Sequence, residues 1–161
     1  ACRSGESRGA LWAEIDLDAA TWSIPGSRMK SGRPHRVPLS DAALALLKAL
    51  PTFAGTDLVF PGLRGKKPLS DMSLTACMRR MGLSAVPHGF RSTFTDWCAE
   101  RTAYPAEVRE MALAHAIGND TEAAYRRGDL FDKRRNLMTE WAKFVSTPPA
   151  KGQNVVNIKA A

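Results

Sequence analysis

Hydrophobic and polar residues alternate along two short runs in the first forty positions. Residues 21–25 and 35–39 both alternate in the way that half-buried strands do, and residues 12–16 form a third short extended piece. Together they predict a small antiparallel sheet of three strands near the N-terminus. Lys30 then falls on the turn between the second and third strands, from which its long side chain can reach a groove.

After residue 40 the hydrophobic positions recur every three or four residues, which is the spacing of an amphipathic helix. Ser40 can cap a helix over residues 41–50, and Pro51 ends it. Ser70 can cap another helix, further helices are predicted from Gly89 and from Pro105 onward, and a longer one is predicted after Gly128. We therefore predict an α+β fold that is mainly helical, with a helical core and the small antiparallel sheet near the N-terminus.

Several chemically useful side chains fall at defined places on these helices. His88 and Arg91 lie one turn apart at a helix start, where backbone N–H groups and the positive end of the helix dipole favour phosphate. Met111 and His115 share one face of the helix after Pro105, which predicts that His115 lies on its buried side. Breakers at 118–121 predict a separate short helix that carries Tyr125.

The composition indicates one compact domain with a polyanionic partner. With 161 residues, 44% of them apolar, the chain suits one compact domain with a single core. Its 23 Lys and Arg residues against 16 Asp and Glu give a net charge of +7, which favours a polyanionic partner such as nucleic acid. No apolar run approaches the length of a membrane span, and the three widely spaced cysteines lack zinc-site spacing. We expect a cytoplasmic protein with reduced thiols.

The basic residues and one tyrosine suit phosphodiester chemistry. Displacement at phosphorus passes through a five-coordinate state with extra negative charge, which Arg3 and Arg91 could hold as forked cations. The Tyr125 hydroxyl, in an electropositive stretch, could act as nucleophile. Lys30 could give a proton to the departing sugar oxygen. This set supplies each role without a metal.

Each of these residues also has an ordinary interpretation. Arg3 near a terminus is usually solvated, and Lys30 could be a surface charge on a turn that also carries Arg28 and Arg33. A histidine on an apolar face, such as His115, is usually a satisfied core residue. Tyr125 could simply pack. Order and spacing together change this balance.

In sequence order the decisive segments are Arg3-Ser4-Gly5-Glu6, Lys30, His88-Gly89-Phe90-Arg91, Leu113-Ala114-His115 and Tyr125. They strongly resemble the catalytic domain of the tyrosine recombinase or phage integrase family, over roughly residues 1–145. The stretches 28–30, 35–40 and 124–129 resemble the branch of prophage and genomic-island integrases.

The resemblance implies a role for each residue of the set. Arg3 and Arg91 would hold the scissile phosphate, and His88 would assist as donor or base. His115 would hydrogen-bond a phosphate oxygen, and Lys30 would protonate the leaving 5′ oxygen. Tyr125 would attack to give a 3′-phosphotyrosyl linkage and a free 5′ hydroxyl.

Other residues would support this set, again by resemblance. Glu6 is expected to orient His88 from behind. DNA contacts are expected from four further basic residues, namely Arg28, Arg33, Arg126 and Arg127. The resemblance implies no cofactor and no metal.

The partners implied are double-stranded DNA attachment sites, a homotetramer on DNA and a DNA-bending accessory protein, with no membrane and a nucleoid-associated location. We expect residues 1–147 to form the catalytic domain, as a fragment of a longer integrase, and residues 148–161 to form a C-terminal tail that is either flexible or docked on a neighbouring protomer. The expected function is integration or excision of a mobile element. Relaxation of DNA by a type IB topoisomerase and a catalytically silent DNA-binding module are the alternatives.

Overall fold

The predicted strands form one antiparallel sheet in the computed structural model, which describes residues 1–115 and 128–148. The strands β1 (Ile15–Asp16), β2 (Thr21–Ile24) and β3 (His35–Pro38) lie in the order β1-β2-β3. Trp22 pairs with Ile15 on one side and Val37 on the other. Trp22 and Ile24, two positions apart, are both buried, as the alternating pattern predicts.

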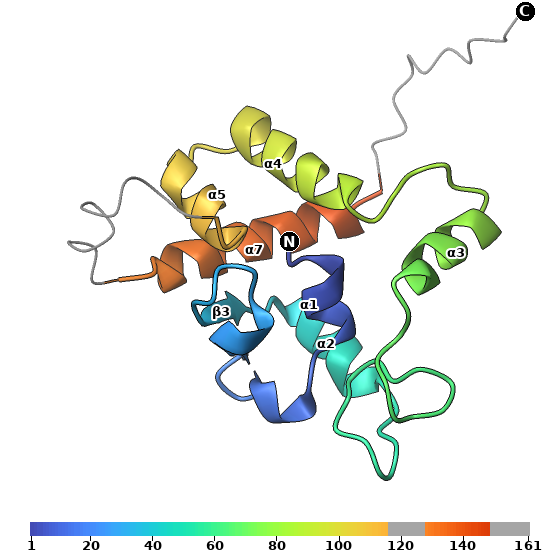
Figure 1. Ribbon diagram of the computed structural model, residues 1–161. Coiled ribbons are helices and arrows are strands. Elements are labelled where there is room, and N and C mark those ends of the chain that lie inside the picture. The colour runs from blue at the N-terminus through green and yellow to red at the C-terminus, as the bar shows by residue number, and fades with distance from the viewer. Residues whose placement is uncertain (116–127, 149–161) are drawn as a thin grey trace, which may run out of the picture.

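Helices make up most of the remaining described chain, so the predicted mainly helical α+β class is confirmed (Figure 1). They are α1 (Ser4–Arg8), α2 (Asp41–Ala49), α3 (Met72–Arg80), α4 (Gly89–Arg101), α5 (Ala106–Ala112) and α7 (Phe131–Ser146), with short 3-10 turns η1 (Trp12–Glu14) and η2 (Gly26–Arg28). None of the helices in the described part is long and apolar enough to cross a membrane.

The cap of α2 confirms one helix signal, whereas the start of α3 corrects another. The Ser40 hydroxyl accepts a hydrogen bond from the Ala43 amide at 3.4 Å, as a capping side chain does. Ser70, by contrast, bonds the Ser73 hydroxyl at 2.9 Å, and α3 begins after Asp71. The Asp71 carboxylate instead pairs with Arg8 at 2.7 Å, so a tertiary contact takes the side chain that could have capped the helix.

The buried apolar residues form two clusters where the composition suggested a single core. One joins the sheet to α2 and includes Trp22, Ile24 and Leu47. The other joins α4, α5 and α7 and includes Phe94 and Leu137, both with no exposed surface. Figure 1 shows α7 lying between the two groups of elements, where it contacts β3 and α2 as well as α5.

A buried arginine fastens α7 to the sheet. Arg134, of which 1% is exposed, donates to the carbonyl oxygen of Arg36 on β3 at 2.6 Å and to that of Asp129 at 2.7 Å. The Asp129 carboxylate accepts from Arg134 at 2.7 Å and from Arg36 at 2.9 Å. Burial would raise the pKa of Asp129, but hydrogen bonding from Arg36 and both positive charges outweigh it and lower that pKa.

Candidate functional site

A pocket of about 380 Å³ lies where α1, the turn between β2 and β3, and the start of α4 come together. Arg3, Lys30, His88 and Arg91 all border it. The other lining residues are Cys2, Ser4, Gly5, Glu6, Arg8, Arg28, Asp71 and Pro87. Four of the six residues predicted to be catalytic therefore meet in one place, although they are up to 88 positions apart in sequence (91 − 3).

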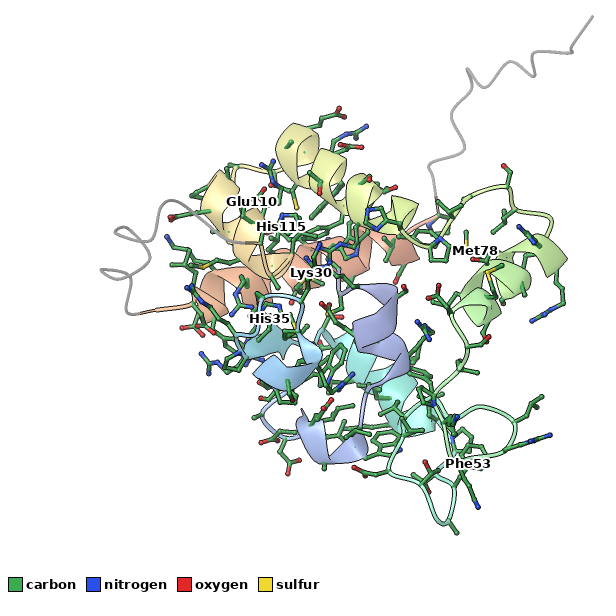
Figure 2. All side chains as sticks on the ribbon, viewed as in Figure 1. Lys30, His35, Phe53, Met78, Glu110 and His115 are labelled. Atoms are coloured by element: carbon green, nitrogen blue, oxygen red, sulfur yellow. The ribbon has the colours of Figure 1, made fainter. Side chains whose placement is uncertain are left out.

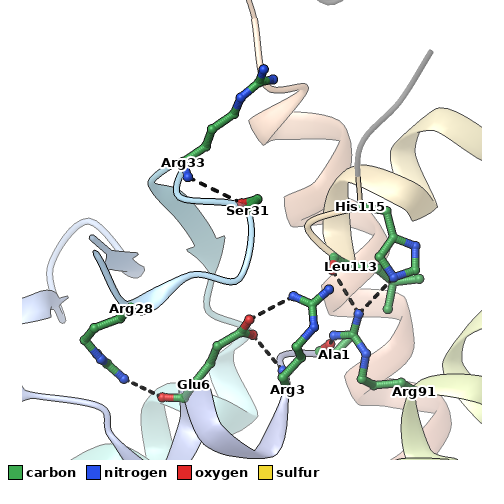
Figure 3. A network of polar contacts seen from close by, with 9 residues as sticks. All are labelled: Ala1, Arg3, Glu6, Arg28, Ser31, Arg33, Arg91, Leu113 and His115. Atoms are coloured by element: carbon green, nitrogen blue, oxygen red, sulfur yellow. Dashed lines mark hydrogen bonds and ion pairs between the residues drawn. The ribbon is translucent and has the colours of Figure 1, made fainter. Parts of the chain in front are cut away.

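Arg91 is the most firmly held of the four. Only 8% of it is exposed, because its guanidinium turns into the interior from the first turn of α4. It donates to the carbonyl oxygen of Ala1, to that of Leu113 at 2.9 Å and to Nε2 of His115 at 3.1 Å (Figure 3). Burial, and then the positive charge of Arg3, lower the pKa of this guanidinium below its usual value. None of its hydrogen-bond partners in the described part of the chain is a carboxylate.

Arg3 is held by Glu6 from the same short helix. One carboxylate oxygen of Glu6 accepts from the Arg3 guanidinium at 2.9 Å, and the other accepts from the Arg3 amide at 2.7 Å. Glu6 is 5% exposed, so the pair fixes Arg3 from the buried side. The family resemblance implies that Glu6 orients His88, and this stays a prediction. The hydrogen bonds of its carboxylate in the described residues run to Arg3, because a residue three positions away at a helix start is within reach.

A tight turn presents Lys30 to the pocket. A Cβ atom on Gly26 would collide with the carbonyl oxygen of Gly32, so the two ends of the turn approach as only glycine allows. Met29, 6% exposed, inserts into the core and anchors the turn. Lys30 follows Met29, is exposed and borders the pocket. Its place on the turn between β2 and β3 is the predicted one.

His88 immediately precedes α4, as predicted. Its side chain is exposed and borders the pocket, three positions before the buried Arg91. The carbonyl of His88 accepts from the Arg91 amide at 3.0 Å, so the first helical turn holds both residues in a fixed relation. The N-terminal end of this helix adds positive potential near both side chains.

His115 lies beside the same arginine, but not in the predicted way. It was expected on the buried face of the preceding helix, yet its side chain is 41% exposed. The helix α5 ends at Ala112, and Ala114 takes the left-handed conformation with φ of 52°. The His115 amide then donates to the Glu110 carbonyl at 3.0 Å, which is the hydrogen bond of a Schellman motif, in which the chain reverses direction after a helix. This reversal turns the imidazole towards Arg91.

The four basic residues predicted to contact DNA differ in their surroundings. Arg28 has internal partners, with a salt bridge to Glu14 and a 2.6 Å bond to the Glu6 carbonyl, and it also borders the pocket, so its DNA contact stays a prediction. Arg33 is exposed, and Figure 3 shows its side chain extending away from the network around Arg91. Tyr125, Arg126 and Arg127 lie outside the described residues, as does most of the predicted tail.

Glu110 is a polar residue of this site for which the sequence pattern gives no signal. The carboxylate of Glu110 lies 2.7 Å from Nδ1 of His115 and 3.0 Å from Nε of Arg109. Figure 2 shows Glu110 and His115 side by side near the end of α5. A spacing of five residues does not bring two side chains together on a continuous helix, so no periodic signal could reveal this pair before the reversal at Ala114 was known.

The arrangement suits an anion. Arginine, lysine and histidine side chains from three segments border the pocket, and the buried guanidinium of Arg91 lacks an acidic hydrogen-bond partner in the described part. A buried charge is costly unless an opposite charge or several hydrogen bonds compensate it. A phosphate group between Arg3, His88 and Arg91 would supply that negative charge.

Comparison with known proteins agrees with this geometry. The model of the Phage integrase family matches residues 1–130, which include every described residue of the predicted set. The chain belongs to the phage integrase family. Within this family it is 40% identical over 147 residues to "Prophage integrase IntA" of Escherichia coli (strain K12), which covers 89% of this chain and 35% of that protein.

Other phage integrase relatives give the same picture. "Prophage integrase IntS" of Escherichia coli (strain K12) is 32% identical, and the "Integrase" of Shigella phage Sf6 is 31% identical, each over 150 residues that cover 90% of this chain. The matched region spans 39% of each of these two proteins. No solved structure matches the chain.

Proposed function

We propose that this chain cleaves and rejoins DNA at specific sites through a 3′-phosphotyrosyl intermediate, and so integrates or excises a mobile element. The observation that carries the proposal is the buried guanidinium of Arg91, which has no carboxylate among its hydrogen-bond partners in the described residues and faces a pocket shared with Arg3, Lys30 and His88. The net charge of +7 and membership of the integrase family support DNA as the substrate.

The proposed reaction assigns one task to each side chain. Arg3 and Arg91 hold the non-bridging oxygens of the scissile phosphate, His88 assists there, and His115 acts through its hydrogen bond with the Arg91 guanidinium. The oxygen of Tyr125 attacks phosphorus, and the bond from phosphorus to the 5′ oxygen breaks. Lys30 gives that oxygen its proton, and His88 accepts the proton of the phenol. Reversal of these steps on a partner strand rejoins DNA without an external energy source.

The second tyrosine of the chain offers a contrast that favours Tyr125 as nucleophile. The Tyr104 hydroxyl donates to Glu140 at 2.7 Å. Burial, and then this hydrogen bond and the charge of Glu140, raise the pKa of Tyr104 to about 12. A phenol held in this way is a poor nucleophile, because its ionised form is disfavoured. With two tyrosines in the sequence, Tyr125 is the remaining candidate.

A nicked suicide substrate that contains the attachment site tests the proposal directly. We expect the protein to form a covalent adduct that migrates slowly on a denaturing gel, and Tyr125→Phe to form none. Tyr104→Phe is the matched control, since it also removes one phenol oxygen, and it should retain the adduct. An adduct that persists in Tyr125→Phe would refute the assignment, and none with the unaltered protein would favour a silent DNA-binding module.

A two-substrate assay separates the proposed recombinase from a topoisomerase. Two attachment-site DNAs of different lengths should give exchanged products of predictable size. Relaxation of a supercoiled plasmid without exchanged products would instead indicate a type IB topoisomerase. We also propose a homotetramer on double-stranded DNA, aided by a DNA-bending protein, which sedimentation of the complex with attachment-site DNA would test.

A further inference from the structure

The imidazole of His115 lies between a carboxylate and a guanidinium. Its Nδ1 atom is 2.7 Å from Oε2 of Glu110, and its Nε2 atom is 3.1 Å from Nη2 of Arg91. The guanidinium is in turn fixed by the Leu113 carbonyl at 2.9 Å. A continuous chain of hydrogen bonds thus runs from Glu110 through His115 to the buried arginine of the pocket.

The chemistry of the two outer groups determines where the imidazole carries its proton. Burial would raise the pKa of Glu110, but hydrogen bonds from His115 and Arg109 outweigh burial and lower it, so this carboxylate is ionised and only accepts. A guanidinium only donates. Nδ1 of His115 must therefore bear the proton, and Nε2 must be the bare acceptor that faces Arg91.

We propose that Glu110 is a positioning residue of this site, which fixes the protonated nitrogen of His115 so that the other nitrogen accepts from Arg91 and orients its guanidinium. The inference rests on the proposed function only for its effect on cleavage. Without the carboxylate, His115 can place its proton on Nε2, and two donors would then face each other across 3.1 Å. Arg91 would lose a hydrogen bond and rotate away from the geometry that grips phosphate.

The state of the ring can be measured without any DNA. Long-range proton and nitrogen correlation spectra distinguish a proton on Nδ1 from one on Nε2, and the chain has only three histidines to assign. At a pH where the ring is neutral, we expect His115 to carry its proton on Nδ1 in the unaltered protein. In Glu110→Ala it should shift towards Nε2, whereas Arg109→Gln, which removes the other partner of the same carboxylate, should leave it unchanged.

Adduct formation on the suicide substrate gives the second readout. Glu110→Ala should slow it by about tenfold to a hundredfold, which is the scale of loss seen when the carboxylate behind a metal-bound histidine is removed. Glu110→Gln keeps an acceptor oxygen and should lie between the alanine variant and the unaltered protein. Because Glu110 acts through His115, Glu110→Ala should cause no further loss when it is added to His115→Ala.

The outcomes separate this inference from the proposed function. Adduct formation unchanged in Glu110→Ala, or losses that add fully in the double variant, would overturn the positioning role. An unchanged His115 ring in Glu110→Ala would overturn it as well. No adduct with the unaltered protein would count against the proposed function alone. Should the alanine variant fail to fold, Glu110→Gln carries both measurements.

Discussion

Arg3 and Arg91 lie close enough that the positive charge of Arg3 lowers the pKa of the Arg91 guanidinium. Two cations that repel each other inside one pocket are stabilised by any anion that binds between them. The repulsion is offset in part by Glu6, which pairs with Arg3 at 2.9 Å. Binding of a phosphate between these two arginines should therefore stabilise the folded protein.

Inorganic phosphate should accordingly stabilise the protein through this pocket. At constant ionic strength, replacing chloride with phosphate should raise the melting temperature, and Arg3→Gln or Arg91→Gln should remove most of the rise. An anion at a hundred times its Kd contributes about 2.7 kcal/mol. Arg64→Gln, which removes one charge from an exposed loop, is the control. An equal rise in all four proteins would mean that phosphate acts generally and not at the pocket.

Lys30→Ala should cleave ordinary DNA slowly but recover on a modified substrate. Loss of a general acid typically costs about a hundredfold to ten-thousandfold in rate. If the bridging 5′ oxygen is replaced by sulfur, the leaving group needs no proton, and the variant should approach the unaltered protein. Arg33→Ala, from the same exposed turn, tests the effect of charge alone and should show no such selective recovery. Without recovery in Lys30→Ala, the lysine is not the proton donor.

Much of this architecture could be predicted because it depends on local signals. The three strands, the turn that holds Lys30 and the helix start at His88 follow from alternation, turn residues and helical spacing. The meeting of Arg3, Lys30, His88 and Arg91 was implied by family resemblance and not by periodicity. The pocket that all four border is consistent with that implication.

What the sequence could not provide depends on tertiary contacts and on one unusual backbone position. The left-handed conformation of Ala114 reverses the chain, exposes His115 and brings Glu110 against it. Alanine carries no signal for that conformation, which glycine usually occupies. Likewise, the meeting of Glu6 and His88 at one pocket depends on how α1 meets α4, which no local pattern encodes.

Stability should depend on pH through His35, which lies on β3 opposite Ile24. Burial, and then the charge of Arg134, lower the pKa of His35 to about 4. In the unfolded chain a histidine binds its proton near pH 6.5. Between pH 6.5 and 4 the unfolded state therefore binds more protons, and the folded state loses stability as the pH falls, by at most about 1.4 kcal/mol per pH unit for one group.

Replacing His35 with glutamine should flatten this part of the stability profile. Urea unfolding at half-unit steps of pH measures it, with His88→Gln as the control, because His88 is exposed on the surface. The folded protein also loses stability in acid when three carboxylates with lowered pKa take up protons, namely Glu14, Glu110 and Asp129. That loss occurs at lower pH and is the same in both proteins. Parallel profiles for His35→Gln and the unaltered protein above pH 4.5 would contradict the prediction.

Arg134 should matter for stability more than any exposed charge on α7. Its guanidinium is 1% exposed and donates to the carbonyl oxygens of Arg36 and Asp129, which join α7 to β3. Arg134→Met fills similar space but leaves those acceptors without their donor, so we expect a loss of about 2 to 4 kcal/mol. Lys133→Met, which removes one charge from the exposed side of the same helix, should change stability by less than about 0.5 kcal/mol. The urea concentration at the unfolding midpoint measures the stability of each variant, provided that the denaturant slope is unchanged. Similar midpoints for the two variants would show that burial of Arg134 contributes nothing beyond its charge.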